Sequence, residues 1–206
     1  MGHGGAYVHA VDPEVERRRR TVVDAPWTWL RQVHGDTVLS VSTPGGGAGS
    51  PADASVSAAE ACVLAVLTAD CAPIAVVSPE GVVAAVHAGW RGLAGGVVDR
   101  AVAAVRAHGG TGELRAVVGP CIHAECYEFG GADLDTVAAT LGDGVRGRTA
   151  TGHPALDVPA AVRAALRQAG VTALDDVDVC TACSDAYFSW RARGELARQA
   201  LVVWRG

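Results

Sequence analysis

Short apolar runs of strand length dominate the middle of this sequence. Three of them follow one another closely, at residues 62–68, 73–77 and 82–86, and turn-forming residues such as those at 78–81 bound them. Runs of this length, rich in Val, Ala and Leu, are typical of strands that are buried on both faces. The pattern predicts three buried strands, of which the last two form a hairpin.

Two β-rich segments flank a polar loop earlier in the chain. Residues 27–30 and 37–42 are rich in Trp, Val and Thr, and the loop between them contains His34 beside a Gly-Asp turn. This order predicts a strand, a loop that carries His34, and a second strand. The glycine-rich segment 44–51 then predicts a surface connection, with a lid over a site as the alternative.

Apolar residues at helical spacing indicate helices in the second half of the chain. They recur along residues 97–105 until a Gly-Gly pair ends the helix, and further helices are predicted over residues 132–141 and 158–169. Asp157 is placed to cap the last of these helices, and Pro159 to open it.

Strands and helices are mixed along the chain without a strict βαβ order. Further strands are predicted over residues 114–118, 177–180 and 200–204. This mixture favours a mixed-sheet α/β (α+β) fold over a doubly wound parallel fold. A chain of 206 residues fits a single domain over residues 1–206.

The composition excludes several classes of site. The sequence contains neither Lys nor Asn, which excludes a Schiff-base lysine, a P-loop lysine and a Cys-His-Asn protease triad. The net charge of −5 gives no electrostatic reason to expect a nucleic-acid partner. A short basic run, Arg17 to Arg20, follows a predicted helix start at Asp12 and Pro13, and we expect it to form a solvated helix face.

The six cysteines are expected to be reduced. The chain starts without the charged and apolar regions of a signal peptide, and no run approaches the ~20 apolar residues of a membrane span. We therefore expect a cytoplasmic protein without membrane contact. In that compartment packing, metal binding or catalysis explains cysteines better than disulfides do.

A histidine-cysteine set suggests a metal site. His34 lies in the predicted polar loop, Cys71 follows the first buried run, and His87 ends the third. Two imidazoles and a thiolate suit zinc, and three protein ligands leave one position for water or substrate, as in catalytic sites. The spacing alone is weak evidence for a metal site, because each of these residues could also be an ordinary residue of a loop or of the core.

The remaining cysteines leave alternatives open. Cys121 and Cys126, with His123 between them, and the pair Cys180 and Cys183 could together form a structural zinc site. The second pair could also be a redox pair, and simple packing is the third reading.

Several motifs resemble one known family. The most specific are an Ala-Asp-Cys block at Cys71 and a His-Ala-Gly-Trp-Arg-Gly block at His87; the others lie in residues 31–36, 119–122, 127–130, 180–181 and 188–191. The chain is similar to the proteins formerly called multicopper polyphenol oxidoreductases or laccase-domain proteins. Members are now described as purine nucleoside phosphorylases with accompanying adenosine deaminase activity, and some carry a peptidoglycan-editing role.

The resemblance implies a fold, a cofactor and a reaction. The implied fold is a mixed β-sheet sandwich flanked by helices, with a Cys-His site like that of deamidating toxins of the CNF type. The implied zinc ligands are His34, Cys71 and His87, and the implied substrates are phosphate and adenosine, inosine or methylthioadenosine. A copper oxidase fits poorly, since multicopper sites need about ten histidines and the sequence has 7.

Four residues are expected to take part in catalysis. Cys71 and His87 belong to the metal set, and Asp70 is expected to orient a ligand histidine or relay a proton, with capping of its turn as the alternative. Arg91 is expected to contact phosphate or ribose, with a structural salt bridge as the alternative.

Two rival functions remain. One is a hydrolase that uses Cys71 and His87 as a nucleophile pair on a peptidoglycan precursor. The other is a zinc-binding partner protein without catalytic activity, since family members usually have a longer N-terminal segment. A monomer and a homodimer are both compatible with the sequence.

Overall fold

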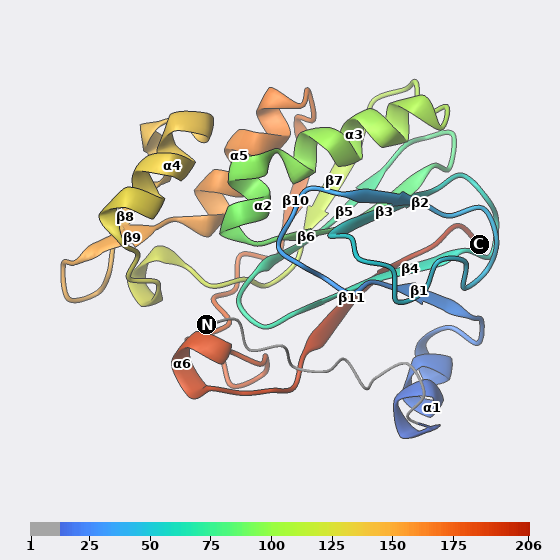
Figure 1. Cartoon of the computed structure of the whole chain (residues 1–206), viewed down its shortest axis with the longest axis horizontal. Helices are drawn as coiled ribbons and strands as arrows, with labels where there is room; N and C mark the ends of the chain where they lie inside the picture. The colour runs from blue at the N-terminus through green and yellow to red at the C-terminus, as the bar shows by residue number, and fades with distance from the viewer. Residues whose placement is uncertain (1–12) are drawn as a thin grey trace.

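The computed structural model describes residues 13–206. Its central element is a six-stranded mixed sheet with the strand order β10-β7-β5-β6-β3-β2 (Figure 1). The strands are β2 (Val38–Ser40), β3 (Ala54–Ser57), β5 (Ala72–Val77), β6 (Val83–Ala88), β7 (Arg115–Val118) and β10 (Ala173–Asp176). β5 and β6 form the predicted antiparallel hairpin, while β10 and β2 pair in parallel with β7 and β3.

A three-stranded sheet packs against one face of the larger sheet. It has the order β1-β4-β11 and consists of β1 (Trp27–Trp29), β4 (Val63–Thr68) and β11 (Gln199–Val203). The core between the two sheets contains Leu64 and Val66 from β4 and Val83 and Ala85 from β6. This arrangement confirms the predicted mixed β-sheet sandwich.

Helices cover the other face of the six-stranded sheet, as Figure 1 shows. α2 (Trp90–Gly95), α3 (Val97–Ala107) and α5 (Val158–Gln168) pack on the sheet, and α4 (Gly131–Leu141) packs on α2 and α5. The apolar face predicted for residues 97–105 is buried in the largest core. Asp157 caps α5 by accepting a hydrogen bond of 2.8 Å from the Ala160 N–H, as predicted.

Shorter elements complete the chain. They are α1 (Pro13–Val22), the 3₁₀ turns η2 (Ala124–Cys126) and η3 (Asp143–Val145), the β8 (Arg146–Arg148) and β9 (Pro154–Leu156) hairpin, and α6 (Trp190–Arg193). Within residues 13–206, no helix combines the length and the apolar character that crossing a bilayer requires.

Three sequence-based expectations need correction or fall outside the structure. Residues 177–180 form no strand, because the edge strand β10 lies one segment earlier in the half-polar Ala173–Asp176. Arg19 is buried and not solvated, because its guanidinium lies 5.9 and 5.7 Å from the Trp27 and Trp29 rings. Asp12, the expected cap of α1, lies outside the described residues.

Candidate metal centre

His34 lies in the loop between β1 and β2, and one buried carboxylate holds this loop in place. The backbone N–H groups of Val33, His34 and Gly35 all donate to the carboxylate of Asp53, at 3.1, 2.9 and 2.7 Å. His34 adopts a left-handed backbone with φ of 59°. A non-glycine residue rarely adopts this conformation, so these three hydrogen bonds help to stabilise it.

His87 reaches the same carboxylate from the opposite side of the site. It is buried at the end of β6, and its Nδ1 lies 2.8 Å from Asp53 Oδ1. Because a carboxylate only accepts, Nδ1 carries a proton, and Nε2 offers a lone pair to a metal once it has released its own proton. Asp53 therefore orients the His87 ring for metal binding through Nε2.

Cys71 completes the group at the connection between β4 and β5. Its Sγ lies 3.9 Å from His34 Nε2, and the ligand atoms of His34, Cys71 and His87 lie within 4.8 Å of one another. The two imidazole rings meet edge to face with centroids 4.8 Å apart. The structure thus brings together the three predicted ligands, which are separated in the sequence.

The electrostatics of this group favour a thiolate. Burial opposes ionisation of the Cys71 thiol, but the charge of His87 and hydrogen bonds from both histidines outweigh it and lower the pKa of Cys71 to about 6. Burial likewise opposes charge on His87, but Cys71 and Asp53 raise its pKa to about 9. Burial also works against the Asp53 carboxylate, and its hydrogen bonds with His87 and the loop still lower its pKa.

The donor set fits a soft or borderline divalent metal. Thiolate and imidazole are the ligands that zinc prefers, and a set of three leaves one coordination position open. Within residues 13–206, the structure contains two groups of side chains with the spacing of metal ligands, and this is one of them.

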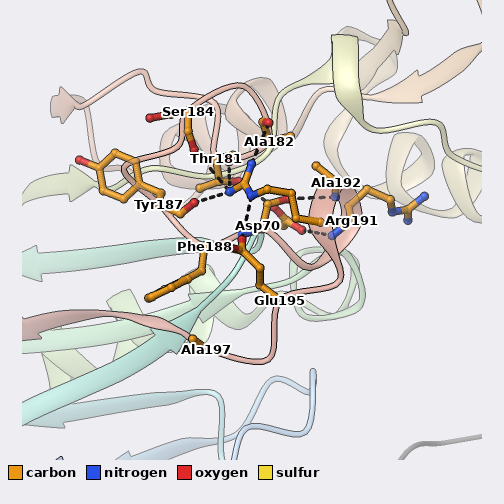
Figure 2. A network of polar contacts seen from close by, with 12 residues as sticks. Asp70, Thr181, Ala182, Ser184, Tyr187, Phe188, Arg191, Ala192, Glu195 and Ala197 are labelled. Atoms are coloured by element: carbon orange, nitrogen blue, oxygen red, sulfur yellow. Dashed lines mark hydrogen bonds and ion pairs between the residues drawn. The ribbon is translucent and has the colours of Figure 1, made fainter.

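The hydrogen bonds of Asp70 run to the C-terminal part of the chain and not to the candidate ligand histidines. Both of its carboxylate oxygens are used at 2.7 Å, one by the Thr181 hydroxyl and the other by the backbone N–H of Arg191 (Figure 2). Asp70 thereby connects the cysteine-bearing turn both to the segment before α6 and to α6 itself. The carboxylate that orients a ligand histidine is Asp53; a proton-relay role of Asp70 stays a prediction.

Three aromatic rings pack together, and a guanidinium group lies over each of two of them. Trp90 packs edge to face against Phe129 at 5.3 Å, and Tyr127 lies 5.2 Å from Phe129. Arg91 is exposed and lies over the Trp90 ring at 4.4 Å, while Arg191 lies over Tyr127 at 4.6 Å. Arg91 is therefore exposed to solvent, and its contact with substrate stays a prediction.

Comparison with known proteins places the chain in a family. The family model described as multi-copper polyphenol oxidoreductase laccase matches residues 5–206. The chain belongs to this laccase family. The match confirms the resemblance seen in the sequence motifs.

Relatives in the laccase family share sequence and fold with the chain. A Streptomyces coelicolor protein named purine nucleoside phosphorylase is 40% identical over 179 residues, which cover 85% of this chain and 74% of that protein. A Mycobacterium tuberculosis protein of the same name is 38% identical over 178 residues, covering 85% and 71%. The structure of YlmD from Geobacillus stearothermophilus superposes with a TM-score of 0.83 at 31% identity, covering 93% of this chain and 78% of YlmD.

Sequence reasoning missed Asp53, which holds both ligand histidines. Asp53 lies just before β3, a strand that was also not predicted, and both are fully buried. The available signal was a lone acidic residue among small residues, Pro51 to Val56. Because a buried carboxylate needs partners, this Asp could have been paired with a nearby histidine.

Proposed function

We propose that this chain is a zinc-dependent purine nucleoside phosphorylase. It cleaves adenosine, inosine or methylthioadenosine with phosphate, and it also deaminates adenosine. The observation that carries the proposal is the convergence of His34, Cys71 and His87 on one point, in a chain whose relatives are named purine nucleoside phosphorylases.

Zinc held by these three side chains would supply a Lewis acid with one open coordination position. The protein itself fixes the ligands. Asp53 accepts from the His87 ring and from the His34 loop, so both histidines are oriented by one carboxylate. A site whose ligands are oriented in advance needs little rearrangement during the reaction.

The neighbouring side chains suit the two substrates. A purine base is flat and aromatic, and the partly exposed rings of Trp90 and Tyr127 offer it surfaces to stack on. Inorganic phosphate is a multivalent anion, and the guanidinium groups of Arg91 and Arg191 offer donors in the fork geometry that oxyanions prefer. We assign Arg91 to phosphate or ribose and the Tyr127 side to the base.

The number of available histidines argues against a multicopper oxidase. Of the 7 histidines, two belong to the candidate metal centre, and the other ligand group in residues 13–206 consists of three cysteines and one glutamate. Multicopper centres need about ten histidines. A single three-ligand site fits nucleoside chemistry better.

The test is a product analysis with and without phosphate. Zinc-loaded protein is incubated with adenosine, and adenine, ribose 1-phosphate and inosine are separated by chromatography. We expect adenine and ribose 1-phosphate in equal amounts only when phosphate is present, and inosine in both conditions. His87→Ala should abolish all three products, whereas Cys62→Ala, at a buried cysteine of the inter-sheet core, should retain them. Adenine release without phosphate would contradict a phosphorylase.

A second candidate is a Cys-His hydrolase acting on a peptidoglycan precursor. Cys71, His87 and Asp53 stand in the order nucleophile, base and orienting acid, which favours this reading. It predicts that turnover of a muropeptide substrate survives complete removal of zinc and fails in Cys71→Ala. Zinc binding without turnover of either substrate class would favour a non-catalytic partner protein.

A further inference from the structure

A second group of metal-ligating side chains lies outside the proposed active site. The Sγ atoms of Cys126, Cys180 and Cys183 and a carboxylate oxygen of Glu125 all lie within 4.8 Å of one another. The closest approach is 3.3 Å between Cys126 Sγ and Cys183 Sγ, and Cys183 Sγ lies 3.9 Å from Glu125 Oε1. The proposed reaction uses none of these four residues.

The main chain brings the two halves of this group together. Glu125 and Cys126 belong to η2, whereas Cys180 and Cys183 follow β10. A parallel β-bridge pairs Cys121 with Cys180, and the Thr181 N–H donates to the Cys121 carbonyl at 3.0 Å. The halves are therefore joined by backbone hydrogen bonds, independently of any ion.

The loop that carries Cys183 is held by the side chain of Arg193. Its guanidinium donates to the carbonyls of Ala182 at 3.1 Å, Thr181 at 3.2 Å and Ser184 at 3.4 Å, and also to that of Tyr187 (Figure 2). Cys183 lies between these anchored carbonyls. Its position is therefore fixed although its side chain is exposed.

The group is covered by the protein on one side only. The backbone N–H of His123 donates to Cys180 Sγ at 3.4 Å, so this sulfur already accepts one hydrogen bond from the protein. Cys180 is buried and Cys126 half-buried, while Cys183 and Glu125 are exposed. The group is thus closed on the protein side and open to solvent on the other, where an ion could enter.

We propose that Cys126, Cys180, Cys183 and Glu125 form a second, structural zinc site. Three thiolates and a carboxylate supply four ligands, and four protein ligands close the tetrahedral shell in the manner of structural sites. Zn–S bonds of ~2.3 Å place the sulfurs of a tetrahedral site about 3.8 Å apart. The observed spacing, 3.3 Å for the closest pair and at most 4.8 Å for the others, brackets this value.

The membership differs from the site considered from the sequence. Cys121 lies outside the group although it pairs with Cys180 through the backbone, and His123 contributes its N–H to a sulfur. Glu125 takes the fourth place. The Thr181 hydroxyl also donates a hydrogen bond to Asp70. A bound ion would therefore link η2 to the turn that contains Asp70.

The test counts zinc ions in variants of the full chain. Protein is saturated with Zn²⁺, desalted and measured by inductively coupled plasma mass spectrometry. Wild type should retain two ions per chain, one for each ligand group. Cys183→Ser and His87→Ala should each retain one, the double variant none, and Cys62→Ser, in the inter-sheet core, two.

Two further measurements keep the test decisive. Glu125→Gln should weaken zinc binding at the second site by roughly tenfold or more in a chelator competition, and Zn²⁺ should protect Cys126 and Cys183 from alkylation. One ion in wild type that His87→Ala removes and Cys183→Ser leaves would overturn the proposal. A Cys126–Cys183 disulfide, found by peptide mapping of the zinc-saturated protein, would also overturn it.

Discussion

At the scale of single residues, Asp53 determines the geometry of the candidate metal centre. The sequence indicated His34, Cys71 and His87 as candidate ligands mainly through the family motifs around them, because their residue types and spacing alone are weak evidence. It was not sufficient to predict Asp53, because hydrogen bonds from a loop 18 to 20 residues away exist only in the folded chain. Partners of this kind follow from tertiary structure and leave no local pattern.

Asp53→Asn should damage both stability and metal binding. An amide replaces one acceptor oxygen with a donor, which then faces the Gly35 N–H or the His87 Nδ1–H. We expect a loss of about 2–3 kcal/mol in the free energy of unfolding and about 10–100-fold weaker zinc binding. Urea unfolding and chelator competition measure the two effects.

The matched control is Asp178→Asn at an exposed position. Asp178 has a positive φ of 51°, which Asn tolerates well. We expect its free energy of unfolding to stay within about 0.5 kcal/mol of wild type. If Asp53→Asn behaved like this control, Asp53 would not be the residue that orients the histidines.

At the scale of elements, the junction between β6 and α2 leaves no room for a side chain at Gly89. A Cβ atom on Gly89 would lie 2.8 Å from His34 Cδ2 and 3.3 Å from Cys71 Sγ. The backbone of Gly89 is extended, with φ of −77° and ψ of 164°, so any residue could adopt it. Glycine is needed here for space and not for its conformational freedom.

Gly89→Ala should therefore impair activity more than stability. The added methyl group pushes His34 away from Cys71, and a displacement of ~1 Å at a reacting centre can reduce the rate by roughly 100-fold. Gly95→Ala is the control, because its Cβ would meet Asp36 at an ordinary 3.6 Å. Steady-state kinetics should show a decrease in kcat/KM for the first variant and none for the second; equal values would show that the junction has room for a methyl group.

At this scale, a strand could be predicted from the sequence only where it is rich in apolar residues. β5 and β6 were predicted because both are almost continuously apolar. β10 was misplaced because an edge strand needs few apolar residues, and Ala173–Asp176 has two aspartates. β3 was missed because Ala54–Ser57 is small and half polar, although it is fully buried between two neighbours.

At the scale of the whole molecule, the candidate metal centre joins the two sheets. His34 follows β1 of the smaller sheet, His87 ends β6 of the larger sheet, and Cys71 lies on the connection from β4 to β5. The sequence could predict these strands and not the way in which the sheets pack, because packing depends on contacts between distant segments. A metal at this position would link the two layers of the sandwich.

Zinc should stabilise the folded protein through this link. In the Cys183→Ser background, which leaves only the first site, free zinc at about 1,000 times its Kd should raise the free energy of unfolding by about 4 kcal/mol. Urea titrations with and without zinc measure the shift. The same titrations of Cys183→Ser with His87→Ala should show no shift, and an equal shift there would place the stabilising ion elsewhere.

From the position of the ligands in two sheets we expect zinc to bind late in folding. His34, Cys71 and His87 cannot meet until β1, β4 and β6 are in place, so zinc has no complete site in the unfolded chain or in a half-formed sandwich. Interactions that form after the transition state slow unfolding and leave the folding rate almost unchanged. The ion would then act by keeping a finished molecule from opening, and the chain would reach its native topology at the same speed in a cell depleted of zinc.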